Sequence, residues 1–545
     1  MIRITGKYPV LILLVLVLIM LLPGLHEPKV TIMEARNFVT AREMLSEGNW
    51  ILTTMNGEPR YEKPPLPTWI TAVFGFLFGI KNVFALRIPG VIMVWATGVF
   101  VFLFSKNLTN NKTNSFINAL ITVSSFYVFG IIIEAPWDIY THGFMMAAIF
   151  FLYRVYNSND KWDALLASVF IACSVLSKGP VSLYALLLPF LLAYALVYGV
   201  KNRFIIKSLL ALIPGLILGS IWFIYVRAAD PEAFLKIAQV ETSNWSGYNI
   251  RPFYYYWNFF IQSGIWAIPA IFGLLHPFMV KRVKNVSHYK LSLFWTLLSV
   301  VLLSLIPEKK ARYMMPVLIP LAINTGFYIY YILKEFGTLK KRFETIPVYF
   351  HFGLLGLAGM AFPLVAFYFF NEQIMANLNL FLPLGICLFL SGSFLFFSLY
   401  NKKMFPAFYL SISVFVLLLI MAVPLNPGFA NQNINYRSIS PLKEEAEKEN
   451  IRVYVLDLIS PEMLWDFGGI IPTITKNESG YILPGEDKFG VLVNDPAIIN
   501  TAEFSSEYII EKREVYDLNT GKYNTKKHKP RYVSNYYIFK KKNID

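Results

Sequence analysis

Two short segments of this sequence combine cations with hydroxyl groups in a way that suits the binding of a phosphate. Residues 307–313 read PEKKARY, so three cations stand at the start of an apolar run. Lys310 and Arg312, beside the unpaired N–H groups of a helix N-terminus, would favour an anion, and Tyr313 would add a hydroxyl donor. The alternative interpretation is an ordinary helix end with a local ion pair.

The second segment, residues 60–67, reads RYEKPPLP. Its prolines restrict the backbone that follows Lys63 and would hold Glu62 and Lys63 in fixed positions. We predict that Lys63 binds phosphate and that Glu62 is its partner or a ligand of a metal. The alternative is a solvated turn with an incidental ion pair.

Carboxylates at two further places are candidates for the chemistry. Residues 33–45 repeat apolar side chains with helical spacing, which predicts an amphipathic helix along the outer surface with Glu34 near its start. Glu34 would be either a charge favoured by the helix dipole or a general base. Asp138 ends the loop 134–138, and His142 follows one turn later. Acidic side chains at membrane depth are usually functional, although this loop could also be a short hydrated connection.

Two other loops carry polar groups of interest. Residues 227–256 contain Glu241 and lead into the aromatic run 254–257, which fits either an interfacial belt or a surface for stacking sugars. Residues 177–180 form a tight turn that carries Lys178. We find no Walker loop and no dinucleotide fingerprint, so ATP-driven transport and hydride chemistry have no support.

The elements that must position these groups are membrane helices. The chain of 545 residues is 56% hydrophobic and only 15% charged, and its mean hydropathy is +0.50. A soluble domain would carry about a quarter charged residues. The two cysteines, Cys173 and Cys387, lie in apolar runs and offer neither a disulfide framework nor a cysteine metal site.

A spanning helix needs roughly 20 mostly apolar residues. The sequence predicts 13 such spans, with a shorter interfacial segment at 66–80. The expected spans are residues 8–24, 88–105, 115–133, 139–156, 162–177, 179–199, 206–226, 257–277, 290–306, 313–334, 347–370, 379–399 and 404–424.

Charge predicts the orientation of these spans. With the N-terminus in the cytoplasm, every short inner loop carries Lys or Arg, as the positive-inside rule requires, whereas the outer loops 134–138 and 371–378 carry none. The loops 25–87 and 227–256 then lie outside, together with the tail. In this orientation the cations of residues 307–313 lie on the side where the rule disfavours them.

The tail has a different character from the rest of the chain. Polar, strand-like runs at 452–458, 488–493, 508–516 and 536–541 are separated by turn signals, which predicts a small soluble α/β domain. We therefore expect a transmembrane domain over 1–424, with its first outer loop at 25–87, and a periplasmic domain over 425–545.

Several motifs together resemble one known group of proteins. The first outer loop contains EAR at 34–36, AREM at 41–44, GNW at 48–50 and YEKPPLP at 61–67. With the acidic loop at Asp138 and KARYMMP at 310–316, these segments resemble the bacterial lipid A aminoarabinose transferases. That group belongs with the protein O-mannosyltransferases in the GT-C class of membrane glycosyltransferases. The resemblance extends over essentially the whole chain.

The resemblance implies a fold, a location and a reaction. It implies about 13 transmembrane helices of GT-C type in a bacterial inner membrane, and transfer of a sugar, with inversion, from undecaprenyl phosphate or a related polyprenyl phosphate to a periplasmic acceptor such as lipid A. Cations must stabilise the departing phosphate. This role would be taken by Lys63, Lys310 and Arg312, with Tyr313 and with Lys309 or Arg60 helping; Tyr61, Glu62 and Glu241 would support them.

The sequence departs from the family at the catalytic carboxylate. Family members commonly show an Asp-Glu pair where this chain reads Met33-Glu34. Our first candidate for the base is Glu34, shifted by one residue; the alternatives are Asp138, or an acceptor phosphate that needs no base. Some members bind a divalent metal through the glutamate equivalent to Glu62; since no second ligand is identifiable, we assign no metal site.

Two alternative functions remain at this point. A protein O-glycosyltransferase would use the same donor, but its Ser or Thr acceptor would need a base. A transporter or flippase of the lipid-linked sugar belongs to another class, and such proteins tend to show internal repeats and broken helices at the bilayer midplane. This chain instead concentrates polar groups at one membrane edge, which favours an enzyme.

Overall fold

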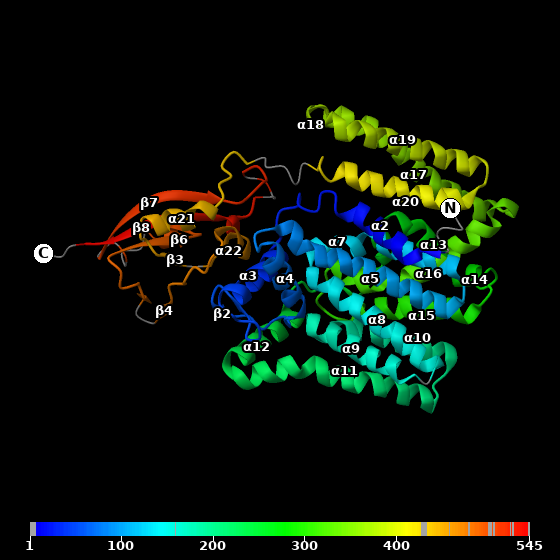
Figure 1. Ribbon diagram of the computed structural model, residues 1–545, viewed down its shortest axis with the longest axis horizontal. Coiled ribbons are helices and arrows are strands. Elements are labelled where there is room, and N and C mark those ends of the chain that lie inside the picture. The colour runs from blue at the N-terminus through cyan, green and yellow to red at the C-terminus, as the bar shows by residue number, and fades with distance from the viewer. Residues whose placement is uncertain are drawn as a thin grey trace. The chain divides into compact units, whose positions relative to one another are not determined.

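The computed structural model describes residues 7–158, 160–426, 433–456, 458–477, 480–499, 504, 507–523, 525 and 528–542, without the side chains of 244–246. The chain separates into two compact units. The first comprises Met1–Glu27, Tyr61–Pro67 and Arg87–Leu425, and the second comprises Pro28–Arg60, Thr68–Leu86 and Asn426–Asp545. Figure 1 shows the elements of both.

The first unit is built almost entirely from helices. In chain order these are α2 (Pro9–Leu21), α5 (Val83–Thr109), α6 (Lys112–Val123), α7 (Phe126–Glu134), α8 (Pro136–Asn157), α9 (Lys161–Lys178), η1 (Leu183–Leu187), α10 (Leu188–Tyr198), α11 (Asn202–Ala229), α12 (Pro231–Gly247), η2 (Phe253–Tyr256), η3 (Phe259–Trp266), α13 (Ala267–Leu274), α14 (His276–Met279), α15 (Val286–Leu305), η4 (Ala311–Met314), α16 (Met315–Glu335), η5 (Phe336–Thr338), α17 (Arg342–Phe369), α18 (Asn371–Ala376), α19 (Leu378–Tyr400) and α20 (Met404–Ala422).

Polar residues set the ends of several of these apolar helices. Asn111, Asp160 and Asn285 are N-caps whose side chains accept from the backbone N–H groups of the first turn of α6, α9 and α15. Gly179, with φ of 69°, follows α9, where an L side chain would be strained. Local sequence therefore fixes where the membrane helices begin and end.

Helix α16 forms the centre of the first unit. It packs against α6, α13 and α15, and most of its side chains are buried. Gly326 allows this approach, because a Cβ atom there would lie 1.7 Å from the Asn118 side chain of α6. Helices α8, α9 and α11 pack in succession, and α17, α19 and α20 lie side by side (Figure 1).

Nine helical segments within the described ranges are long and apolar enough to cross a membrane. They are Val83–Thr109, Lys112–Glu134, Asn202–Ala229, Phe253–Leu274, Val286–Leu305, Ala311–Thr338, Arg342–Phe369, Leu378–Tyr400 and Met404–Ala422. The four other expected spans coincide with α2, α8, α9 and the pair η1 and α10. A polytopic helical fold is thus confirmed, while the number 13 stays a prediction.

The second unit contains a four-stranded sheet in the order β3-β6-β8-β7. Its strands are β3 (Val453–Val455), β6 (Lys488–Val493), β7 (Tyr508–Asp517) and β8 (Val533–Lys541). β3 runs parallel to β6, and the other pairs are antiparallel. With the helices α21 (Ser440–Lys448) and α22 (Pro461–Phe467), these strands confirm the expected small α/β domain.

Most of the expected first outer loop, residues 25–87, belongs to this second unit. Helix α3 (Ile32–Ser46) packs against α22, and its Arg42 donates to the backbone carbonyl oxygens of Leu464 and Gly469 over 3.1 and 2.9 Å. The loop also contains the hairpin β1 (Thr54–Met55) and β2 (Glu58–Pro59). Asn56, between these strands, exchanges two hydrogen bonds of 2.8 Å with the Ile471 backbone.

The expectation that residues 33–45 form a helix is therefore confirmed, while its place along the outer surface stays a prediction. Ten of its residues are buried, including Arg42 and Glu43. The physical reason is that hydrogen bonds satisfy these charges: Glu43 accepts from Thr54 Oγ1 over 2.7 Å and from the Asn56 backbone N–H over 2.6 Å.

Candidate functional site

An ion pair between Asp138 and Lys178 connects two helix ends of the first unit. Pro136 stands at the N-terminal end of α8, and Asp138 lies in its first turn, where the helix dipole favours a negative charge. Lys178 is the last residue of α9. Its ammonium contacts Asp138 Oδ1, and only 2% of Asp138 is exposed. Each charge thus lies at the helix end that stabilises it.

Tyr313 joins this ion pair to the segment 307–313. The Nζ atoms of Lys178 and Lys310 lie 5.5 and 5.6 Å from the centre of its ring, within the range of cation–π attraction. The Tyr313 hydroxyl donates to Glu308 Oε1 over 3.0 Å, and Lys310 Nζ lies 2.6 Å from the same oxygen. Arg312 interacts electrostatically with Asp138. The structure therefore brings Asp138, Lys310, Arg312 and Tyr313 together.

Lys309 is directed elsewhere. Its ammonium donates to the carbonyl oxygens of Ile306 and Arg251 over 2.6 and 3.0 Å, and the side chain is 3% exposed. Burial lowers its pKa from the ordinary value. A β-bridge between Ile250 and Glu308 joins the same two loops. Lys309 thus fastens the loops together, which is a structural role.

A second pair of contacts holds the segment 61–63 against α11 and α12. Tyr61 donates to Asp230 Oδ2 over 2.8 Å, and its ring meets the ring of Trp222 edge-on. Burial and this hydrogen bond raise the pKa of Tyr61 to about 12. Lys63 Nζ lies 3.3 Å from Glu241 Oε2. Three predicted residues, Tyr61, Lys63 and Glu241, are therefore neighbours.

Glu62, in contrast to Lys63, is exposed. Across the described ranges there is no group of three or more His, Cys, Asp or Glu side chains that could hold a metal ion. The divalent ion considered near Glu62 thus has no ligand set among these residues.

Two predicted residues, Glu34 and Arg60, lie in the second unit. Glu34 completes a capping box: its carboxylate accepts from the Thr31 backbone N–H over 3.0 Å, and its own N–H donates to Thr31 Oγ1 over 3.3 Å. Thr-x-x-Glu is the sequence signature of this motif, and our sequence interpretation missed it. Arg60 is 5% exposed and contacts Thr40 Oγ1 of α3 over 3.4 Å.

Two residues of the Asp138 cluster were not among the predicted site residues. Lys178 was noted only as a cation in a turn, and His142 only as a neighbour of Asp138. His142 lies one turn after Asp138 in α8 and interacts electrostatically with both Asp138 and Lys178. The end of α9 at Gly179 was a readable signal, because it places Lys178 at a helix C-terminus.

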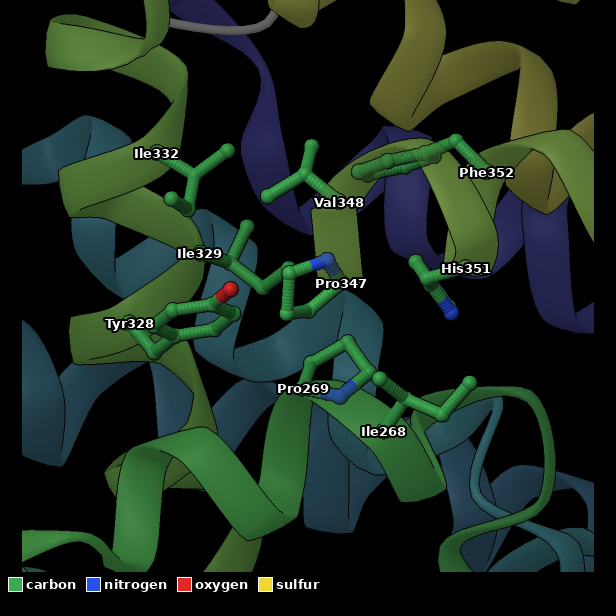
Figure 2. A pocket seen from close by; sticks show the side chains of 9 residues that line it. All are labelled: Ile268, Pro269, Tyr328, Ile329, Ile332, Pro347, Val348, His351 and Phe352. Atoms are coloured by element: carbon green, nitrogen blue, oxygen red, sulfur yellow. The ribbon is translucent and has the colours of Figure 1, made fainter. Parts of the chain in front are cut away.

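The first unit also has a small apolar pocket between α13, α16 and α17. Figure 2 shows the side chains around it, among them Pro269, Tyr328 and His351. Its cavity volume is about 10 Å³, which is room for about one water molecule. None of the predicted site residues lines it. This pocket is therefore separate from the charged cluster, by which we mean Asp138, Lys178, Lys310, Arg312 and Tyr313.

In chemical terms, three cations of the first unit are each paired with a carboxylate. Lys178 is paired with Asp138, Lys310 with Glu308 and Lys63 with Glu241. A phosphate can replace a carboxylate as the partner of Lys or Arg because both are oxyanions that accept charge-assisted hydrogen bonds. Arg312 Nε is buried and has no hydrogen-bond partner within the described part of the chain.

Comparison with known proteins places these features in a family context. Residues 62–226 match the family described as dolichyl-phosphate-mannose-protein mannosyltransferase. The chain is 26% identical over 374 residues to an undecaprenyl phosphate-alpha-4-amino-4-deoxy-L-arabinose arabinosyl transferase from Edwardsiella ictaluri, over 66% of this chain and 65% of that protein. It is 25% identical over 305 residues to a transferase of the same description from Proteus mirabilis, over 54% of each. The chain thus matches about half to two thirds of the length of these relatives.

Solved structures extend the similarity over nearly the whole chain. ArnT from Cupriavidus metallidurans bound to undecaprenyl phosphate has a TM-score of 0.65 and 15% identity, and 98% of each chain is covered. The same protein in the apo state has a TM-score of 0.63. At this identity the likeness shows a shared fold. The predicted resemblance to aminoarabinose transferases and mannosyltransferases is therefore confirmed.

Proposed function

We propose that this chain is a membrane glycosyltransferase that moves a sugar, with inversion, from a polyprenyl phosphate, most simply undecaprenyl phosphate, to a periplasmic acceptor such as lipid A. One observation carries the proposal: the buried Asp138 interacts with Lys178 and Arg312, and the Tyr313 ring links Lys178 to Lys310. The similarity to arabinosyl transferases that use such donors supports it.

The cations would stabilise the leaving group. In the displacement the acceptor oxygen bonds to the anomeric carbon while the bond from that carbon to the phosphate oxygen breaks, and the electron pair stays on the phosphate. The growing negative charge is met by Lys310, Arg312 and Lys178, with Tyr313 as a hydroxyl donor. Lys63 joins them by exchanging Glu241 for the phosphate, since that ion pair is partly exposed.

Asp138 is the better candidate for the base than Glu34. It lies among the cations of the first unit, whereas the Glu34 carboxylate accepts hydrogen bonds within its capping box. A hydroxyl acceptor would pass its proton to Asp138. Because Lys178 stabilises the ionised carboxylate, Asp138 would be a weak base, and this favours an acceptor that is already anionic, such as a lipid phosphate.

We infer that the charged cluster faces the periplasm, with the N-terminus in the cytoplasm, the second unit in the periplasm and the chain in a bacterial inner membrane. The distribution of Lys and Arg among the short loops supports this orientation. Contacts among the expected outer loops support it as well, since loop 134–138 reaches Lys178 and residue 250 is bridged to residue 308.

The test measures sugar transfer from labelled undecaprenyl-phosphate sugars to lipid A and to total protein, in membranes that carry the wild type or Lys63→Ala. Label on lipid A that disappears in the variant supports the proposal. Label on protein instead of lipid would make the chain a protein O-glycosyltransferase. If the wild type moves the labelled lipid across the membrane but transfers no sugar to any acceptor, the chain is a transporter.

A further inference from the structure

One turn below Asp138, helix α8 carries two buried polar side chains whose hydrogen-bonding capacity is not met. His142 is 3% exposed and Thr141 is 0% exposed. Neither His142 Nδ1 nor Thr141 Oγ1 has a hydrogen-bond partner among the residues that the structure describes. Buried polar atoms are normally paired, because loss of water without a new partner destabilises the fold.

These atoms belong to the neighbourhood of the proposed site. His142 interacts electrostatically with both members of the Asp138–Lys178 ion pair. Arg312, which also interacts with Asp138, has its own unpartnered atom, Nε. Hydrogen-bonding groups of two elements, α8 and the segment 307–313, are thus unsatisfied around one carboxylate.

The backbone of the same turn of α8 has a partner in α9. Ser174 Oγ of α9 donates to the Thr141 carbonyl oxygen over 2.6 Å and lies 2.6 Å from Ser182 Oγ. Packing against α9 therefore pairs the Thr141 carbonyl oxygen, whereas the side-chain atoms Thr141 Oγ1 and His142 Nδ1 have no partner among the described residues. A small polar ligand in this place would give both side-chain atoms a hydrogen-bond partner.

We propose that His142, with Thr141, recognises a ring hydroxyl of the sugar that the lipid phosphate carries, while Arg312 Nε donates to an oxygen of the phosphate. A neutral imidazole nitrogen is a donor or an acceptor according to its tautomer, and a hydroxyl can serve as either partner. His142 is then a specificity residue for the sugar part of the donor. This inference rests on the proposed function.

Binding measurements on the purified full chain in lipid nanodiscs separate the two proposals. The probes are undecaprenyl phosphate without a sugar and its glucose, arabinose and 4-amino-4-deoxyarabinose derivatives. We expect His142→Ala to weaken the best-bound glycoside about tenfold and to change the affinity for bare undecaprenyl phosphate less than twofold, because one hydrogen bond to the sugar is lost. If the wild type binds none of the four lipids, the proposed function fails.

Two matched variants complete the test. His142→Asn places an amide nitrogen near the position of Nδ1 and should restore most of the glycoside affinity. His351→Ala removes another buried histidine, 4% exposed and also with an unpartnered ring nitrogen, from the apolar pocket of Figure 2, and should leave both affinities unchanged. Equal weakening of both lipids by His142→Ala, or no weakening of either, would overturn the inference.

Donors that each lack one ring hydroxyl identify the contact without relying on the fold of a variant. Wild-type protein should lose about tenfold in affinity for one such deoxy donor, and that donor should bind His142→Ala no more weakly than the intact donor does, because the same hydrogen bond cannot be lost twice. Additive losses for every deoxy donor would show that His142 contacts no hydroxyl and that its nitrogen is satisfied in another way, for example by a bound water.

Discussion

The two ends of helix α8 each carry an ion pair with a buried carboxylate, yet the arginines compared with them differ in how far their hydrogen bonds are satisfied. At one end Asp138 is paired with Lys178, and at the other Arg154 Nε lies 3.1 Å from Asp163. Sixteen residues separate Asp138 from Arg154, which corresponds to roughly 24 Å along a helix. By their ion pairs alone, the two ends of α8 are therefore equivalent.

The arginines near the two ends show the difference. Arg282, on the Arg154 side of the bundle by the expected topology, donates to Tyr331, Glu344 and the Phe278 carbonyl oxygen, and its guanidinium stacks 3.7 Å from the Phe278 ring centre. Arg312, in contrast, has a buried Nε with no partner among the described residues. An arginine whose donors are all paired stabilises the fold, whereas the unpartnered Arg312 Nε near Asp138 leaves a donor for a ligand.

The largest expected effect is that of Arg312→Ala. Loss of a positioned cation from a partly buried site should lower kcat about 10²- to 10³-fold, as for other donors that stabilise a developing negative charge. Arg282→Ala is the matched control: it should lower the melting temperature and leave the kcat of the folded fraction within about twofold. A similar loss of kcat in both variants would contradict the distinction between the two ends. Transfer assays on equal amounts of folded protein measure this.

Asp138→Asn should produce the next largest effect. It leaves Lys178, whose side chain is 14% exposed, without its counter-charge. Loss of one partner of a buried pair typically destabilises a protein by about 3–5 kcal/mol, and the substitution also removes the proposed base. We expect loss of stability together with at least about tenfold lower kcat. Asp163→Asn at the other end should destabilise the chain without a fall in kcat per folded molecule. Thermal unfolding and initial rates, measured on the same preparations, distinguish the two results.

Tyr61→Phe tests the anchoring of the segment that carries Lys63. It removes a hydrogen bond to a carboxylate, and such bonds contribute about 1.5–3 kcal/mol. The neutral phenol is the form that the site favours, since the folded pKa of about 12 lies above the ordinary 10.0. This contribution should be constant below about pH 10 and be lost as the pH rises through about 12. Protease sensitivity near residue 61 against pH measures it, and equal profiles for wild type and variant would refute it.

Glu241→Gln should modestly raise the affinity for undecaprenyl phosphate. The Lys63–Glu241 pair is 22% and 38% exposed, so its attraction is weak and screened by salt. With its competitor neutralised, Lys63 should bind undecaprenyl phosphate about two- to fivefold more tightly at low salt. Titrations at low and high salt check this, with Glu372→Gln in α18 as the control. Weaker binding in the variant would mean that Glu241 positions Lys63 for the lipid.

The smallest effect is expected for Glu34→Gln. Gln is accepted at this position of a capping box, so stability should change by less than about 1 kcal/mol. If Glu34 is a structural group like Arg282, kcat should stay within about twofold. A loss of about 100-fold in a well-folded variant would instead make Glu34 the base and remove Asp138 from that role.

The sequence was sufficient to predict the elements. Long apolar runs predict helices at each expected span, and the strand-like runs coincide with β3, β6, β7 and β8, because hydropathy and periodicity are properties of a few neighbouring residues. The two segments proposed to bind phosphate were readable for the same reason, since cations and prolines stand side by side at 60–67 and 307–313. The capping box of Glu34 was equally local and was overlooked.

Only the tertiary structure decided which of these residues meet. Asp138 and Lys178 are 40 positions apart, Tyr61 and Asp230 are 169 apart, and Arg42 lies more than 400 positions from the carbonyl groups that it contacts. Nor did spacing predict that Lys309 binds backbone carbonyl oxygens while Lys310 faces Glu308. Pairing of this kind depends on how the helices pack and which loops cross. It produces no periodic pattern in the sequence, so the sequence alone does not predict it.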